Sequence, residues 1–132
     1  MRWRPALLVV GIVLSVAITG PAHAAYSVQI EGATVPNGED DTVQIDFEFA
    51  CDPNSEPVVE ITAVDQTTSA QGTTRPVWRD PEVCDGTVHP AIAHVPADNG
   101  ANFRKGDRIK VSVTLSGSEN RSARDDTELT AR

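Results

Sequence analysis

The sequence predicts an all-β protein, built as a sandwich of two antiparallel sheets behind an N-terminal export signal. Two observations favour this fold. Hydrophobic residues recur at every second position in several segments, and turn-forming Pro, Gly, Asn and Asp residues separate those segments. No stretch carries the 3.6-residue hydrophobic period of an amphipathic helix.

Residues 1–24 have the features of a secretory signal peptide. Two arginines precede an apolar core at residues 6–18, and a small-x-small triplet ends at Ala24. An uncleaved membrane anchor is the alternative, but this core is shorter than the ~20 residues that cross a bilayer. We therefore expect cleavage after Ala24, no stable membrane association afterwards, and a single secreted, extracellular domain at residues 25–132.

Residues 42–51 and 108–116 alternate most clearly between apolar and polar side chains, as half-buried strands do. Weaker patterns predict five more strands, at 26–32, 58–64, 73–79, 86–95 and 126–131. Pro76 and Pro90 confine two of these to sheet edges or bulges, and the short, acidic last segment suits a terminal edge. About seven strands favour an immunoglobulin-like sandwich, with a small closed barrel as the alternative.

The segment before the strand at 108–116 supports a packed sandwich end. Phe103 precedes a turn at Lys105-Gly106-Asp107, a recurring way to enter a core strand. We expect Phe103 to plug one end of the sandwich, while Gly106 supplies a positive φ in the turn.

Cys51 and Cys84 are the two cysteines of the chain, and an oxidising destination makes a disulfide between them the expected state. In the chain-entropy model, closing this loop is worth ~3.8 kcal/mol. A reactive thiol is the alternative, but His89 follows Cys84 on an extended run that does not bring them together. His89 and His94 are an odd number of residues apart, so a regular strand would point them to opposite faces and no metal site is expected.

Composition and motifs argue against several functions. The formal charge of −8 disfavours nucleic acids and anionic membranes as partners. The chain has no Gly-x-Ser-x-Gly elbow, His-Glu-x-x-His pair or phosphate-binding loop, so we expect no enzyme and no cofactor. Acidic clusters at 38–42, 124–127 and Asp98-Asn99, in expected loops, leave calcium or small-ligand binding as an alternative.

The stretch from 67 to 81 holds the one cluster of aromatic and basic residues in the mature chain: Arg75, Trp78 and Arg79. These residue types favour binding hot spots, so the cluster is the candidate contact surface. Alternatively, Trp78 covers one end of the core while the arginine stems pack around it. The leading hypothesis is a secreted, non-enzymatic binding or structural module with an unknown extracellular or cell-wall partner. A protease inhibitor presenting the 67–81 loop is the second.

Three features together carry a family resemblance: Cys51 closing a strand, CDGTVH at 84–89, and NGANFRKGDRIKVSVT at 99–114. With them the chain resembles a group of small secreted actinobacterial proteins of unknown function. The resemblance implies an immunoglobulin-like sandwich with one disulfide and no catalytic residues. Immunoglobulin domains proper space their cysteines more widely, so we expect this bridge to tie a strand end to a connecting loop.

The export signal and the disulfide predict the mass of the secreted protein. Protein collected from culture medium should begin at Ala25 and contain no free thiol, because the oxidising exterior pairs Cys51 with Cys84. Intact-mass spectrometry with and without a reductant and a thiol-alkylating reagent measures both. An alkylated cysteine in unreduced protein would contradict the disulfide, and an intact residue 1 would contradict the cleavage.

Overall fold

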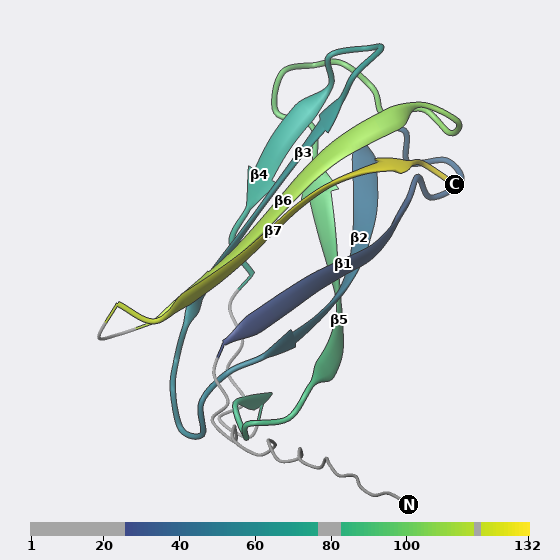
Figure 1. Cartoon of the computed structure of the whole chain (residues 1–132). Helices are drawn as coiled ribbons and strands as arrows, with labels where there is room; N and C mark the ends of the chain where they lie inside the picture. Colours follow the sequence, from purple (N-terminus) through teal and green to yellow (C-terminus); the bar gives the residue numbers. More distant parts are fainter. Residues whose placement is uncertain (1–25, 77–82, 118–119) are drawn as a thin grey trace, which may run out of the picture.

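Seven strands in two antiparallel sheets form the part of the chain that the computed structural model describes, residues 26–76, 83–117 and 120–132 (Figure 1). The first sheet has the strand order β1-β2-β5 and the second β4-β3-β6-β7. The strands are β1 (Ser27–Thr34), β2 (Thr42–Ala50), β3 (Val58–Asp65), β4 (Gln71–Thr74), β5 (His89–Pro96), β6 (Arg108–Ser116) and β7 (Ser122–Thr130). Within these ranges, no helix is both long and apolar enough to span a membrane. The expected signal peptide lies outside them.

The predicted two-sheet, seven-strand fold is confirmed, and most predicted strands coincide with observed ones to within a few residues. The strand predicted at 73–79 is displaced: β4 begins at Gln71, ends at Thr74 and pairs with β3. Hydroxyls of Thr62 and Thr73 lie 3.1 Å apart across this pair. The predicted strand begins too far along the chain because β4 carries only small and polar residues, which give no hydrophobic alternation.

β7 differs most from the prediction of a short strand at 126–131. It spans nine residues, so the acidic cluster at 124–127 lies within a strand and not in a loop. The inward-facing positions include the polar residues Asp125 and Thr127, which hid the alternation. Asp125 has a specific role there, because its Oδ2 accepts a hydrogen bond of 2.8 Å from the Ile30 amide in β1.

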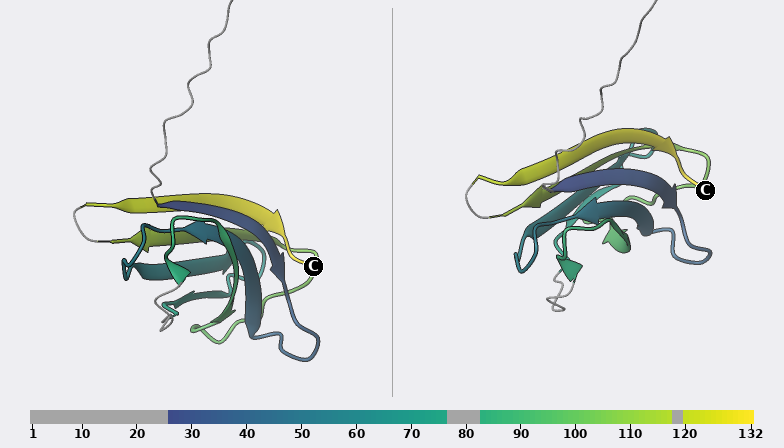
Figure 2. Two further views of the ribbon diagram at one scale, coloured as in Figure 1. Left: turned by 90° about the horizontal axis from the view of Figure 1, so that it is seen from below. Right: turned by 60° about the horizontal axis from the view of Figure 1, so that its bottom comes forward.

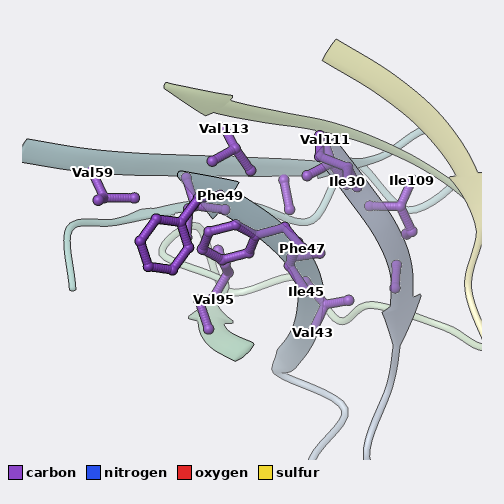
Figure 3. Packing of buried hydrophobic residues seen from close by; sticks show 14 of the residues in the cluster. Ile30, Val43, Ile45, Phe47, Phe49, Val59, Val95, Ile109, Val111 and Val113 are labelled. Atoms are coloured by element: carbon purple, nitrogen blue, oxygen red, sulfur yellow. The ribbon is translucent and has the colours of Figure 1, made fainter. Parts of the chain in front are cut away.

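The core lies between the sheets and consists of the alternate, inward-facing side chains of the strands (Figure 3). The centroids of the Phe47 and Phe49 rings of β2 are 6.1 Å apart, and aliphatic side chains from both sheets surround them. Phe103 is 1 % exposed and belongs to this cluster, as expected of a residue that plugs the end. Gly106 has the expected positive φ, 90°.

One side of the sandwich is closed by contacts between β1 and β7, which lie side by side in both views of Figure 2. A β-bulge interrupts the pairing of β1 with β2 between Ile30 and Gly32. Beyond it, the Arg132 amide donates to the Ala33 carbonyl (3.0 Å) and the Val35 amide to the Arg132 carbonyl (2.7 Å). The edge of the first sheet therefore bonds to the chain end that follows β7.

The opposite side is closed at one end by β4 and β5. A Cβ added at Gly72 would lie 1.9 Å from the Pro96 carbonyl oxygen, so this approach requires glycine. The Asp98 amide donates to the Gln71 carbonyl at 2.8 Å. Asn99 Nδ2 donates to the Ser69 carbonyl at 2.7 Å and ties the two connecting loops together.

β5 is an edge strand, as Pro90 predicted. It pairs with β2 in an unbroken register that includes Pro90 opposite Glu48 and Pro96 opposite Thr42. The N–H and C=O groups of one residue point to the same side of an antiparallel strand, and alternate residues point the same way. Both prolines are therefore accommodated where the missing N–H would have pointed away from β2.

The Asp65 carboxylate organises the loops at the end of the sandwich where β3 ends. Its Oδ1 accepts the amides of Thr67 (2.8 Å) and Thr68 (3.0 Å), and its Oδ2 accepts that of Arg104 (3.2 Å). Burial by itself raises the pKa of Asp65, but these hydrogen bonds and one to Asp107 lower it overall. The pKa of Asp107 is raised by burial and by its contact with Asp65. Of the two carboxyl groups, Asp107 is therefore the one that keeps its proton to higher pH.

This pair predicts opposite effects of two similar substitutions. Asp65→Ala removes the acceptor of three part-buried amide hydrogen bonds and should lower the free energy of unfolding by about 3 kcal/mol. Protonation of Asp107 contributes to the free energy of unfolding, and this contribution is fully present below its unfolded-state pKa of about 4. It is lost as the pH rises through the raised folded-state pKa. Asp107→Asn should therefore unfold at the same or a higher urea concentration than the natural protein at pH 7. Equal losses in both variants would contradict this assignment.

Candidate binding surface

Cys51 and Cys84 form the predicted disulfide, and the described residues contain no free cysteine. Cys51 directly follows β2, and Cys84 lies in the connection between β4 and β5. The bridge therefore ties a strand end to a loop, as expected. Two backbone hydrogen bonds reinforce it: Gly86 amide to Cys51 carbonyl, 3.0 Å, and Asn54 amide to Cys84 carbonyl, 3.1 Å.

His89 lies beside the disulfide loop and has a structural role. Its Nε2 is 2.9 Å from Asp85 Oδ1 and 3.3 Å from Thr87 Oγ1, and its ring centroid is 6.1 Å from that of Phe49. Asp85 Oδ1 also accepts the amide (2.9 Å) and hydroxyl (2.7 Å) of Thr87. These contacts join Asp85, Thr87 and His89 beside the disulfide and hold this part of the loop together.

The remaining acidic and histidine candidates are separated. His89 lies on the core side of β5 and His94 on the solvent side, as their odd spacing predicted. In the cluster at 38–42, the Asp40 carbonyl accepts the Phe103 amide at 2.7 Å. Across the described ranges, no group of three or more His, Cys, Asp or Glu side chains is placed to hold a metal ion.

The predicted aromatic–basic cluster is described in part. Arg75 is exposed and forms an ion pair with Glu60 of β3, with nitrogen–oxygen distances of 2.5 and 2.8 Å. Trp78 and Arg79 lie outside the described residues. The expectation of a 67–81 loop is wrong over 71–74, because β4 is hydrogen-bonded there to β3. Arg75 follows that strand directly.

A different surface, which the sequence interpretation missed, carries exposed apolar side chains. Five alternate residues point outward from β5 and the residue before it, and all five are exposed. We call this surface the β5 face: Val88, Pro90, Ile92, His94 and Pro96. Val88 is 59 % and Ile92 62 % exposed. The signal in the sequence was a second set of alternating apolar residues, out of phase with the core-facing Ala91, Ala93 and Val95.

The outward side chains of β2 border the β5 face with negative charge. Glu48 pairs with Pro90 and Asp46 with Ile92 in the strand register. Asp46 Oδ1 accepts a hydrogen bond from Gln44 Nε2 at 3.2 Å. The Arg132 side chain lies near Asp46, because a Cβ on Gly32 would be 2.7 Å from Arg132 Nη2 and 3.8 Å from Asp46 Oδ2. Among the described residues, Glu48 has no ion-pair partner.

The four-stranded sheet differs in this respect. Its outward-facing carboxylates have arginine partners at 2.5–2.8 Å: Glu60 with Arg75, Asp126 with Arg124, and Glu128 with Arg108. Negative charge on that sheet is therefore compensated within the chain, whereas that of Glu48 is not.

A hollow of about 130 Å³ lies where Glu48 meets the end of the β5 face. Its lining residues are Ser27, Val28, Gln29, Glu48 and Val88. The side chains of Val88 and Glu48 lie on this outer face, whereas that of Val28 packs against the core. A second hollow of about 220 Å³ lies among loops that include Asn37 and Phe103. In that hollow, Lys105 Nζ donates to Asn37 Oδ1 at 2.5 Å, so its cation already has a partner.

No protein-family model matches this chain, and no curated protein matches it.

The Asp85 contacts predict an acid-sensitive contribution to stability. Hydrogen bonds from the Thr87 hydroxyl and amide and from His89 lower the pKa of Asp85 from 3.8 to about 2. A carboxyl group whose pKa is lowered on folding stabilises the folded state at pH values above its unfolded-state pKa, and this contribution is lost as the pH falls through its folded-state pKa. The melting temperature of the natural protein should therefore fall more steeply between pH 4 and pH 2 than that of Asp85→Asn. Identical slopes in this window would contradict the assignment.

Proposed function

We propose that this chain is an exported, non-enzymatic module that binds another polypeptide through the β5 face. The observation that carries the proposal is the exposure of Val88 and Ile92 on one outward row of an edge strand. Elsewhere the outward rows of both sheets are mainly polar or charged. Apolar side chains grouped on a surface otherwise polar mark sites of protein contact.

Export of the protein is supported by two features. The first 24 residues have the composition of a signal peptide. The disulfide between Cys51 and Cys84 fits an oxidising compartment, because such bridges are rare in reducing ones. The partner is therefore sought outside the cell, among secreted or wall-associated proteins.

The proposed fold family is the immunoglobulin-like sandwich, and with it membership of the actinobacterial group that the sequence resembles. The strand order supports it, since the chain crosses between the sheets after β2, after β4 and again after β5. Such crossings between antiparallel sheets are those of Greek-key sandwiches. Domains of this kind commonly serve as scaffolds for recognition, which agrees with a binding role.

Matched variants of one residue type test the proposal. Val58 of β3 and Val88 are both 59 % exposed but lie on different sheets. The exported protein is used to select from a phage-displayed library of random peptides. Peptides selected by the natural protein should bind Val88→Asp and Ile92→Asp at least about tenfold more weakly, since a buried charge opposes an apolar contact. They should bind Val58→Asp with unchanged affinity.

The controls for this experiment are structural. All three substituted side chains are largely exposed, so the variants should melt close to the natural protein. Selection of no peptide, or equal weakening by Val58→Asp and Ile92→Asp, would refute binding through the β5 face.

A further inference from the structure

Glu48 of β2 borders the β5 face, and its environment differs from that of the outward-facing carboxylates on the other sheet. It points outward from β2, opposite Pro90 in the ladder, while Phe47 and Phe49 on either side of it point into the core. Its carboxylate has no cationic partner in the described chain. The corresponding carboxylates of the other sheet are all neutralised by arginine, as described above.

The hollow beside Glu48 combines two properties that seldom occur together on an exposed sheet. Val88 provides an aliphatic wall, and Glu48 provides a negative charge at the same depression. Lysine and arginine side chains have the complementary form, because an apolar stem carries a terminal cation. Ser27 and Gln29 add polar groups at the rim, where a hydrated ammonium or guanidinium group would lie.

We infer that this hollow receives a lysine or arginine side chain of the bound polypeptide. The stem lies against Val88, and the cation pairs with the Glu48 carboxylate. An aliphatic or aromatic side chain nearby in the partner then covers Ile92. The inference rests on the proposed function and specifies its ligand: an extended segment with a basic residue next to an apolar one.

Charge also decides against a second copy of this chain as the occupant. A two-fold symmetric contact places the same patch on both sides, so it would bring Glu48 and its acidic surroundings against themselves. The chain carries a formal charge of −8, which adds long-range repulsion between copies. A basic partner is instead attracted by this negative charge, because opposite charges speed association and favour the partner that carries them.

The selected peptides test the inference directly. They should contain lysine or arginine beside an aliphatic or aromatic residue, and replacing that basic residue by glutamine should weaken binding about fivefold or more. Glu48→Gln should weaken binding of the basic peptide by a similar factor and leave the glutamine peptide unaffected. Raised salt should weaken only the binding of the basic peptide to the protein that retains Glu48, because salt screens the ion pair. Glu128→Gln on β7 is the matched control and should change nothing.

The outcomes separate this inference from the proposed function. Peptides that lose affinity for Ile92→Asp but bind Glu48→Gln normally would retain the β5 face as a binding site and overturn the basic-side-chain pocket. Peptides indifferent to both substitutions would refute both proposals. Enrichment of acidic or uncharged peptides would likewise overturn the pocket. Equal loss with Glu48→Gln and Glu128→Gln would show a general charge effect and overturn it as well.

Discussion

The packing of one strand, β2, between its neighbours and the opposite sheet determines the rest of the structure. Its inward residues, from Val43 to Phe49, are almost fully buried. Side chains alternate strictly along a strand, so burying Phe47 and Phe49 leaves Glu48 no direction except outward. A register shift of one residue would bury the carboxylates and expose the rings. The register of β5 on β2 then sets Ile92 outward beside them.

The closed sides of the sandwich explain why a face, not an edge, is the candidate contact surface. On one side the Asp125 carboxylate and the Arg132 backbone satisfy the outer groups of β1. On the other side Gly72 lets β4 approach the end of β5 within a distance that no other residue would permit. Because main-chain groups are occupied at these points, the proposed contact is made by side chains on a sheet face.

The sequence predicted those parts of the fold in which hydrophobic alternation is uninterrupted, such as β2 and β6, and it predicted the single disulfide. It did not predict the length of β7, because Asp125 takes an inward position for a hydrogen bond to a distant strand. The β5 face escaped notice because apolar residues occupy both sides of β5, which conceals the direction of each. Arg75 is bound to Glu60, a contact that only the pairing of β3 with β4 creates.

Pro90 and Pro96 have a consequence for the behaviour of the protein at high concentration. A strand with a free edge is a template on which further chains can polymerise, since each exposed N–H and C=O invites a new neighbour. With two donors missing on its outer side, β5 cannot extend a continuous ladder to another molecule. The protein can thus display an apolar row to the medium while resisting the fibrous assembly that such rows often initiate.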